Sequence, residues 1–282
     1  MSVPTSPVRI HRHSAAYWQV TFDNPPLNLI DPEVMAGLRD LLTRLESDRD
    51  VKVVVFGSAD DEFFLAHYDA VRAAEMPTDT GPTGLPPWPD VVVRLARAPF
   101  VSIACLRGRA RGAGSEFALA CDLRFASIEK AVLGQPEVGS GVVPGGGAME
   151  ILPALVGRSR ALEIVLGSED FDAATAERYG WVNRALPDAE LDAFVDGFAS
   201  RIARFDQNAL STAKDIINRR SALRLEDIVE SGQALRTAAV SPNGRARLAE
   251  LLARGMQQRG PFEFDFGAEL GRDDSASGDP AQ

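Results

Sequence analysis

The sequence is poor in several features that would mark large classes of protein. Its two cysteines, Cys105 and Cys121, lack CxxC spacing and lie in apolar stretches, so they are interpreted as small core residues of a reducing compartment. No apolar run approaches the ~18 residues of a membrane span. The opening MSVPTSPVRIHRHSAAYW has no apolar core of a secretory signal. We therefore expect a cytoplasmic protein with no membrane partner.

Positive charge is also scarce. Lys and Arg number 30 against 40 Asp and Glu, which gives a net charge of −10. Because nucleic-acid binding depends on neutralising phosphates, this balance disfavours a nucleic-acid partner, although it leaves room for a local basic patch facing a small anion. The 282 residues are 45% apolar and 25% charged, which is ordinary globular usage for one or two domains.

Hydrophobic periodicity predicts an α/β chain with a helical C-terminal part. Trp18, Val20 and Phe22 alternate with polar residues as in a half-buried strand, and the apolar run 51–56 is typical of a strand buried on both faces. Further strands are expected over 100–106 and 123–126, and helices over 32–46 with Asp31 as its cap, 90–97, 191–202, 208–219 and 225–256. Recurring β-β-α units followed by helices suggest an α/β core and a helical subdomain.

Several segments are less regular. Residues 63–76 are expected to begin as a loop and become a helix capped by Asp69. The Pro- and Gly-rich stretch 76–89 carries Trp88 and is interpreted either as a mobile surface loop or as a lid or pocket wall. Residues 1–14 are expected to form a loose arm. The polar residues 271–282 are expected to be disordered.

Common cofactor and nucleophile motifs are missing. There is no GxxxxGK[ST] loop, GAGSEF lacks the third glycine of the dinucleotide fingerprint, and no GxSxG elbow occurs. His11, His13 and His67 form no cluster with metal-ligand spacing. We therefore expect no metal and no flavin or nicotinamide cofactor.

The segment GAGSEFALACD at 112–122 is the first with chemical content. Its small residues let the backbone approach a ligand, and the amides of 112–114 lie at the positive end of the helix that follows. Such N–H groups suit an oxyanion formed from a carbonyl. Glu116 lies in the first turn of that helix, where it either complements the helix dipole or acts on a substrate. The segment alone does not decide between these roles.

A second carboxylate favours the catalytic interpretation. The stretch GQPEVGSGVVPGGG at 134–147 carries Glu137 near its start, where a structural turn needs no carboxylate. Two glutamates separated by about one β-α step could converge on one water or one substrate carbon. Paired carboxyl groups are a standard route to proton transfer.

At residues 15–255 the sequence resembles the crotonase superfamily, the enoyl-CoA hydratases and isomerases. The family pattern GxAxGGGxELALACD is met by GRARGAGSEFALACD, and QPExxxGxxPGxGG by QPEVGSGVVPGGGA. The run LPALVGRSRALEIVLGSEDFDAATAERYGWVN follows the family's LPRLVGxxxAxELxLTGxxxxAxxAxxxGLVN closely. NPPLNLID matches the family's N-terminal NPxxNALD. Together these motifs are specific, whereas each alone would be weak.

The resemblance implies a fold, a ligand and a site. The fold is a crotonase-like spiral of ββα units over 15–205 with a C-terminal helical trimerisation region over 206–260, followed by a tail over 261–282. The ligand is a CoA thioester, which is substrate rather than cofactor, and the assembly is a trimer or a dimer of trimers. The oxyanion hole consists of the backbone N–H groups of Tyr68 and Ala113. Glu116 and Glu137 match the two glutamates that hydratases of the family use on one water.

The sequence departs from the family pattern in the segment FLAHYD. His67 stands where the family has Gly, and Tyr68 where it usually has Ala. His67 is interpreted mainly as a packing or solvent-facing residue, with an added acid/base role as the alternative. Glu150 adds a carboxylate where the family often has GTQR, either functional or on a solvated helix face. Contacts with the substrate are expected from five residues: Ala66, His67, Asp69, Trp88 and Gly112.

Three arginines alternate before the first motif. Arg107, Arg109 and Arg111 are expected to share one face, where they either contact CoA phosphates or form surface ion pairs.

The sequence thus favours an enoyl-CoA hydratase or, in reverse, a dehydratase. A double-bond isomerase, a thioester hydrolase or a decarboxylase remains the alternative, because fold does not fix the reaction. A non-catalytic scaffold or RNA-binding member is disfavoured by the net charge of −10 and by the glutamate pair.

Overall fold

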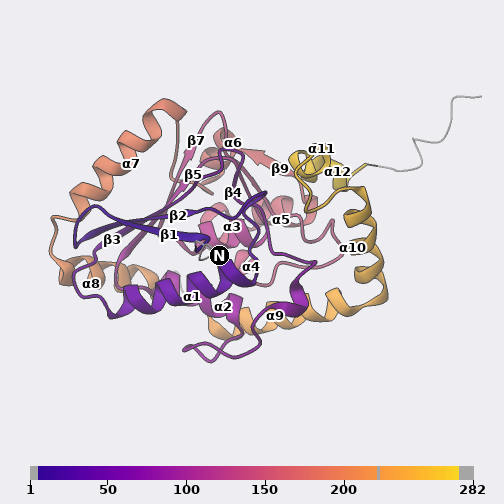
Figure 1. The fold of residues 1–282 in the computed structure, drawn as a ribbon, viewed down its shortest axis with the longest axis horizontal. Helices are drawn as coiled ribbons and strands as arrows, with labels where there is room; N and C mark the ends of the chain where they lie inside the picture. The colour runs from indigo at the N-terminus through magenta and orange to yellow at the C-terminus, as the bar shows by residue number, and fades with distance from the viewer. Residues whose placement is uncertain (1–5, 221–222, 273–282) are drawn as a thin grey trace, which may run out of the picture.

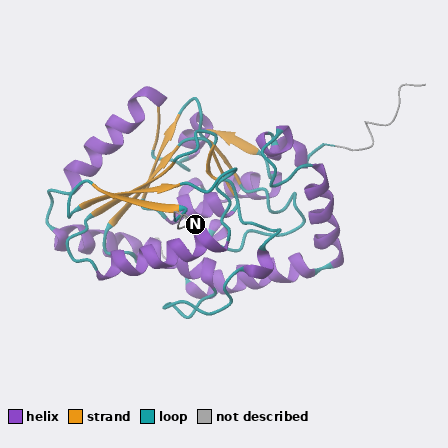
Figure 2. Cartoon of the chain, viewed as in Figure 1, coloured by secondary structure: helices purple, strands orange, loops and turns teal. Residues whose placement is uncertain are grey.

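The computed structural model describes residues 6–220 and 223–272. It contains two β-sheets surrounded by helices (Figures 1 and 2). Within the described residues no helix is both long enough and apolar enough to cross a bilayer. The predicted disorder at 271–282 concerns mainly residues outside the described ranges, as does the start of the expected arm.

The larger sheet has six strands in the order β1-β2-β3-β5-β7-β10. The strands are β1 (Val8–Arg12), β2 (Tyr17–Phe22), β3 (Val53–Ser58), β5 (Val101–Leu106), β7 (Leu123–Ser127) and β10 (Arg184–Leu186). β1 pairs with β2 antiparallel, and all other neighbours in this sheet are parallel. Parallel neighbouring strands require long connections between them. In this chain those connections contain helices and the strands of the smaller sheet.

The smaller sheet has four strands in the order β4-β6-β8-β9. They are β4 (Phe63–Leu65), β6 (Arg109–Arg111), β8 (Val132–Gly134) and β9 (Asp170–Asp172). β4, β6 and β8 run parallel to each other. From β3 to β8, successive strands alternate between the two sheets, and a helix follows each pair, which confirms the predicted spiral of ββα units.

Twelve α-helices are assigned within the described residues. They are α1 (Pro32–Ser47), α2 (Pro87–Arg97), α3 (Ala113–Ala120), α4 (Ala148–Val156), α5 (Arg158–Gly167), α6 (Ala173–Tyr179), α7 (Asp188–Ile202), α8 (Gln207–Asn218), α9 (Leu225–Val240), α10 (Pro242–Arg254), α11 (Pro261–Phe264) and α12 (Phe266–Leu270). A short 3-10 turn spans Ala73–Glu75. Figure 1 shows α9 and α10 along the lower and right edges of the molecule.

Apolar side chains on opposite faces of the larger sheet form two cores. Val53 and Val55 of β3 lie with Val195 of α7 in one cluster, whereas Val54 and Phe56 belong to the main cluster. The strand is therefore buried on both faces, as predicted. In the main cluster four rings pack edge to face, stacked or tilted, with centroid separations from 5.1 to 6.3 Å: Phe22, Phe56, Phe64 and Phe117.

Local signals in the sequence explain where α1 begins. The Asp31 side chain accepts a hydrogen bond of 2.8 Å from the Val34 N–H, and Pro32 occupies the first helical position. Loss of this cap would cost about 1 kcal/mol.

Two predictions about irregular segments are wrong. The sequence predicts a loose arm over 1–14. Instead, residues 8–12 form β1, the edge strand of the larger sheet, which pairs antiparallel with β2. Asp69 caps no α-helix; its carboxylate accepts from the N–H groups of Val71 and Arg72, which makes a local turn. The apolar spacing needed to continue a helix is lacking after that turn.

The C-terminal end also differs from expectation. The predicted helical stretch 225–256 divides at Ser241, whose side chain caps α10 while Pro242 starts it. The predicted tail at 261–282 is ordered as far as it is described, because 261–264 and 266–270 form α11 and α12. These short helices lie beside β9 (Figure 1), and Phe266 is 1% exposed.

Candidate functional site

The candidate site lies at the carboxyl ends of β4, β6 and β8. The Arg111 N–H donates to the Ala66 carbonyl oxygen at 3.1 Å, and the Gly112 N–H donates to that of Gly134 at 3.0 Å. These bonds hold the three strand ends side by side. The chain segments that carry Tyr68, Ala113 and Glu137 therefore leave one edge of the smaller sheet together.

Glu116 is buried in the first turn of α3 and accepts two hydrogen bonds. One comes from the indole Nε1–H of Trp88 at 2.8 Å, and the other from the Gly146 N–H at 2.7 Å. The stretch 76–89 therefore holds part of the pocket wall, since Trp88 lies in the first turn of α2 and points at Glu116. A carboxylate with two directed donors is fixed in position.

Glycines allow both carboxylates to approach the backbone. Gly112 has φ +50°, and a Cβ there would lie 2.8 Å from Oε1 of Glu137. A Cβ at Gly146 would collide with Trp88 Nε1 and with Oε2 of Glu116. The two Gly-rich motifs are therefore required by the close packing of these glutamates, as well as by the turns themselves.

The two carboxyl groups respond differently to the same surroundings. Burial raises the pKa of Glu116, while the bonds from Trp88 and Gly146 oppose that rise. Burial and then repulsion from Glu116 raise the pKa of Glu137 well above its usual range. Glu116 is thus the better solvated carboxylate, and Glu137 is the group more easily kept protonated.

Gln135 is a site residue that the sequence interpretation missed. With its amide nitrogen turned toward Glu137, it donates to both carboxyl oxygens at 3.0 and 3.3 Å and accepts from the Ser115 hydroxyl at 3.0 Å. Gln135 is fully buried. The signal was available, because Gln135 opens the QPE motif and a buried amide needs hydrogen-bond partners.

The two expected oxyanion donors lie at the ends of β4 and β6. Two backbone hydrogen bonds with Ile30 hold the chain on both sides of Tyr68. The Ile30 N–H donates to the His67 carbonyl oxygen at 2.9 Å, and the Ile30 carbonyl oxygen accepts from the Asp69 N–H at 3.0 Å. Ala113 is the first residue of α3, after Gly112. In the described part of the chain neither the Tyr68 nor the Ala113 N–H has an acceptor. Burial raises the pKa of the Tyr68 phenol to about 12, so this side chain is neutral.

His67 is buried with a partner from the C-terminal end. Its Nε2 lies 3.1 Å from Oε1 of Glu263 in α11, and its Nδ1 lies 3.0 Å from the Tyr68 carbonyl oxygen. Burial lowers the pKa of His67, but the charge and hydrogen bond of Glu263 outweigh this effect and hold it above its usual value. His67 therefore does not face solvent, and its packing includes an ion pair across 196 residues.

The remaining residues expected at the substrate have protein partners. Oδ1 of Asp69 accepts from the Gln257 side chain at 3.0 Å. Ala66 uses its N–H toward Asn28 and its carbonyl toward Arg111. Oε1 of Glu150 accepts from the Ser231 hydroxyl, and the charge of Glu150 adds to the rise in the pKa of Glu116.

The three arginines divide between two places. Arg107 pairs with Asp188 at 2.8 Å and with another carboxylate of α7. Arg109 and Arg111 both donate to the Phe264 carbonyl oxygen. The expectation of one shared face therefore holds only for the last two. The structure shows all three in pairs within the protein, which favours the ion-pair interpretation.

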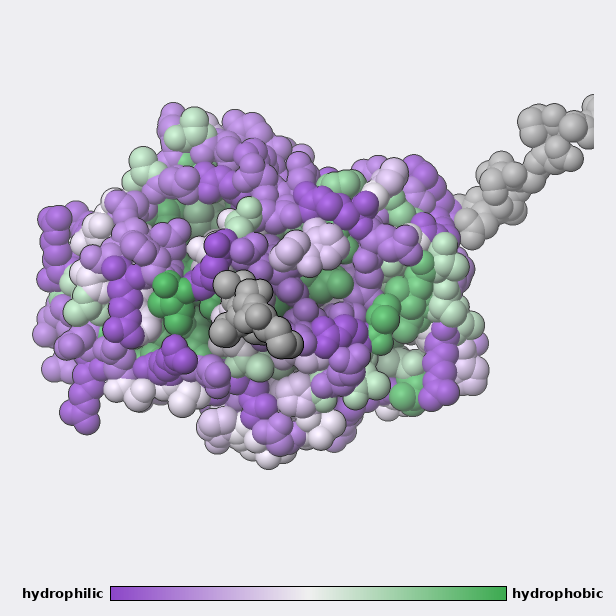
Figure 3. Space-filling model, in the orientation of Figure 1, coloured by the Kyte–Doolittle hydropathy of each residue, from purple (hydrophilic) through white to green (hydrophobic). Residues whose placement is uncertain are grey.

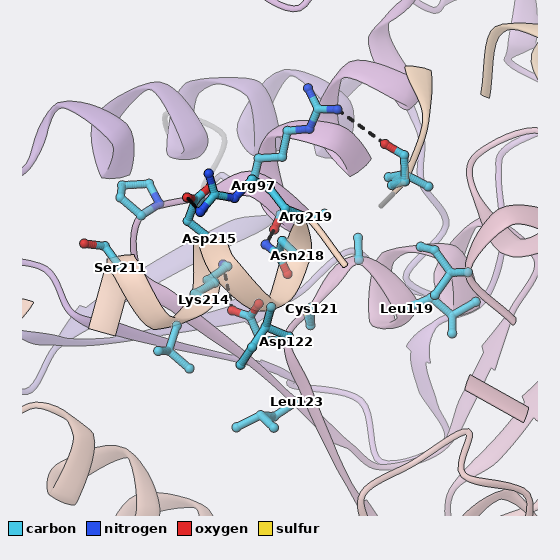
Figure 4. Close-up of a pocket in the computed structure, with 18 of the residues that line it drawn as sticks. Arg97, Leu119, Cys121, Asp122, Leu123, Ser211, Lys214, Asp215, Asn218 and Arg219 are labelled. Atoms are coloured by element: carbon cyan, nitrogen blue, oxygen red, sulfur yellow. Dashed lines mark hydrogen bonds and ion pairs between the residues drawn. The ribbon is translucent and has the colours of Figure 1, made fainter. Parts of the chain in front are cut away.

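A cavity of about 1100 Å³ lies elsewhere, between the ends of α3 and α4 and the helix α8 (Figure 4). Lys214 of α8 pairs there with Asp122 at 2.8 Å. The described residues that line it include Glu150 but neither Glu116 nor Glu137. Among the described residues, no group of three or more His, Cys, Asp or Glu side chains is arranged to hold a metal ion.

Comparisons with known proteins show the family of the chain. The family described as Enoyl-CoA hydratase/isomerase matches residues 12–253. A short-chain-enoyl-CoA hydratase of Clostridium acetobutylicum is 32% identical over 201 residues, which covers 71% of this chain and 77% of that protein.

Two solved structures have the same fold. One, named as a candidate enoyl-CoA hydratase from Streptomyces avermitilis, has a TM-score of 0.90 and 45% identity, covering 96% of this chain and 99% of its own. The other, an enoyl-CoA hydratase from Mycobacterium avium subsp. paratuberculosis, has a TM-score of 0.78 and 26% identity, covering 89% and 97%.

Proposed function

The chain belongs to the enoyl-CoA hydratase/isomerase family, and we propose that it adds water to the double bond of an enoyl-CoA thioester or removes it in the reverse direction. The observation that carries the proposal is the pair of glutamates: Glu116 is buried and accepts from Trp88 and Gly146, whereas Glu137 accepts from Gln135 and its pKa is raised well above its usual range. Such a pair can hold one water and divide the roles of base and acid.

The roles follow from the hydrogen bonds. Glu116, the better solvated carboxylate, takes a proton from water as the water oxygen bonds to the β carbon. Glu137, the more easily protonated group, gives its proton to the α carbon as the double bond is consumed. The N–H groups of Tyr68 and Ala113 donate hydrogen bonds to the thioester carbonyl oxygen and stabilise the negative charge that develops on it. One water enters: its oxygen and one hydrogen form the hydroxyl on the β carbon, its other hydrogen goes to Glu116, and Glu137 supplies the hydrogen on the α carbon. A proton then passes from Glu116 to Glu137 to restore the starting state.

No cofactor is needed in this scheme, since CoA is part of the substrate and each proton has a donor and an acceptor within the site. The Gly112 backbone, next to Glu137, offers the closest approach for the acyl group.

Product analysis on a panel of unsaturated and 3-hydroxyacyl-CoA esters tests the proposal. Water addition raises the product mass by that of one water, a double-bond shift leaves the mass unchanged but alters retention, and thioester cleavage releases CoA. Water addition or loss on at least one ester is the expected result. A double-bond shift or CoA release without any hydration would contradict the proposal in favour of another reaction of the family.

We also propose a trimer or a dimer of trimers. Large apolar side chains lie exposed on α5, α8 and α9, including Leu166, Ile217 and Val240 at 62–64% exposure. Figure 3 shows a largely hydrophilic face on which hydrophobic side chains gather in separate areas, one of them beside α10. In an oligomer with closed symmetry, neighbouring subunits would cover such apolar surfaces. Light scattering should give three or six chains, and a monomer at micromolar concentration would exclude this assembly.

A further inference from the structure

The C-terminal segment, defined here as residues 256–270, returns to the loop that carries the proposed oxyanion donor of Tyr68. Its α11 places the Glu263 side chain, which is fully buried, against the imidazole of His67. The two side chains lie 196 residues apart in sequence. A buried carboxylate this far from the glutamate pair has no part in the proposed reaction, so its position needs another explanation.

Glu263 is held by contacts on both oxygens. Oε1 lies 3.1 Å from Nε2 of His67, and Oε2 accepts from the Gln257 N–H at 2.8 Å. The Glu263 carbonyl accepts from the buried Arg111 at 2.7 Å, and Arg111 is itself fixed by Asp170 at 2.6 and 2.7 Å. The carboxylate therefore occupies one defined position relative to β6 and β9.

His67 transmits that position to the backbone. Its second ring nitrogen, Nδ1, lies 3.0 Å from the Tyr68 carbonyl oxygen. An imidazolium can donate to the Tyr68 carbonyl and to Glu263 at the same time, because both of its nitrogens carry protons. The orientation of the ring is thus fixed at both ends, and one end is the residue whose N–H points to the proposed substrate.

The imidazole is directed away from the glutamate pair. The Cβ of His67, and not its ring, is among the atoms nearest to a Cβ built on Gly112. The ring lies 5.8 Å from that of Phe266, on the side of the C-terminal segment. His67 is therefore placed to orient the loop rather than to exchange a proton with the substrate.

We propose that Glu263 is a positioning residue: it fixes the His67 imidazole and, through the contact of that ring with the Tyr68 carbonyl, the backbone of the loop whose Tyr68 N–H is the proposed oxyanion donor. The inference rests on the proposed function for the role of the Tyr68 N–H. It assigns the C-terminal segment a part in the reaction, although none of its atoms touches the reacting carbons.

The test uses the full-length protein and three variants. Glu263→Ala removes the partner of His67, whereas Glu263→Gln keeps the shape and one acceptor but no charge. Glu269→Gln is the matched control, because Glu269 lies in the same segment and pairs with Arg254 rather than with the loop. Tm and the fraction of active sites are measured for each, so that kcat is expressed per folded site.

Two readouts separate positioning from a merely structural role. The first is kcat against KM on an ester that the wild type hydrates. The second is the absorption band of a bound aryl-conjugated enoyl-CoA, which moves to longer wavelength when its carbonyl accepts hydrogen bonds. If the Tyr68 N–H is out of place, the transition state loses more stabilisation than the bound substrate does. Glu263→Ala should therefore lower kcat by about 10–10²-fold with a much smaller change in KM.

The expected pattern is a reduced band shift and kcat in Glu263→Ala, partial recovery in Glu263→Gln and no change in Glu269→Gln. If Glu263→Ala does not fold, Glu263→Gln alone should still lower both readouts. Unchanged kcat and band shift in folded Glu263 variants would overturn the proposal while leaving hydration by the wild type intact. Conversely, if the wild type hydrates no ester but its band shift is lost in Glu263→Ala, the positioning role stands and the proposed reaction fails.

Discussion

Two pairs of ionisable side chains lie near Gly112, and their surroundings disfavour the charged form in one pair and favour it in the other. In the first pair, Glu116 and Glu137 are like charges, and burial raises the pKa of both. In the second pair, His67 and Glu263 are opposite charges, and their attraction outweighs burial, so the pKa of His67 rises and that of Glu263 falls. The first pair resists being fully charged, whereas the second favours it.

This difference in charge preference fits a role in proton transfer for the first pair and a structural role for the second. A carboxyl group that is costly to ionise can hold a proton near neutral pH and give it up during a reaction. An ion pair that is stable in its charged form does not exchange a proton easily, but it holds together the two chain segments to which its side chains belong. The protein thus places a reactive pair in the ββα core and a supporting pair between that core and its C-terminal segment.

The largest effect short of removing a carboxylate should come from the oxyanion hole. Ala113→Pro deletes one of its two N–H donors, because proline has none. Loss of such a donor typically lowers kcat by about 10²–10³-fold. Ala113→Gly keeps the N–H and serves as the control, and circular dichroism establishes that both variants fold. A folded Ala113→Pro enzyme with normal kcat would remove Ala113 from the mechanism.

A smaller effect is expected at Trp88. Trp88→Phe removes one of the two donors to Glu116, so the pKa of Glu116 should rise further and the acid limb of the kcat/KM profile should move to higher pH. A hydrogen bond to a charged group contributes about 1.5–3 kcal/mol. Its loss should lower kcat/KM by about 10–100-fold at pH values below the shifted acid limb.

The matched control for this change is Trp18→Phe. The Trp18 indole donates to the Ala15 carbonyl at 3.2 Å, away from the site, and its loss should leave the acid limb in place. An unshifted limb in Trp88→Phe would show that Glu116 is not the group whose ionisation the profile reports.

The smallest effects concern stability, and the two pairs should respond with opposite sign. The pKa of Glu137 is raised in the folded state, so the unfolded chain ionises first and the protein loses stability as pH rises above about 4.5. Glu137→Gln removes this loss. It should therefore stabilise the protein by about 1–3 kcal/mol at pH 8 and by little near pH 4, as measured by urea unfolding.

Glu263→Gln should do the reverse. His67 contributes stability that is full below its unfolded pKa of about 6.5 and is lost as pH rises through its raised folded pKa. Glu263 contributes stability above its unfolded value, which is lost as pH falls through its lowered folded pKa. The destabilisation should thus be greatest near pH 5.5–6.5. A destabilisation independent of pH would mean that the neighbouring Arg111, Asp170 and Asp69 carry the contact instead.

The motifs of the sequence were sufficient to propose the pair of Glu116 and Glu137, but not to predict the contact between His67 and Glu263, for a physical reason. Glu116 and Glu137 each follow a Gly-rich turn, and those turns are short patterns in which neighbouring residues determine the backbone. Similarly, the Asp31 cap and the alternating core residues of β3 act over a few positions. The spiral of ββα units then brings these local patterns to one sheet edge.

The contact between His67 and Glu263 has no local signature. PFEFDFGAEL contains no turn motif that relates it to FLAHYD. Its short helices are stabilised by packing of Phe262 and Phe266 in a separate cluster with Leu251 of α10, rather than by helix propensity. Gln135 was missed for a different reason: it opens the QPE motif, but its contacts with Glu137 and Ser115 are seen only in the folded site.

The central claim is that Glu116 and Glu137 act as a unit on one water, and a double-mutant cycle tests it most directly. Glutamine keeps the shape of each side chain but cannot exchange a proton in the same way. On an ester that the wild type hydrates, Glu116→Gln and Glu137→Gln should each lower kcat by about 10²–10⁴-fold, and the double variant should lose far less than the product of the two. Near-normal rates in both single variants, or losses that simply multiply, would contradict the account.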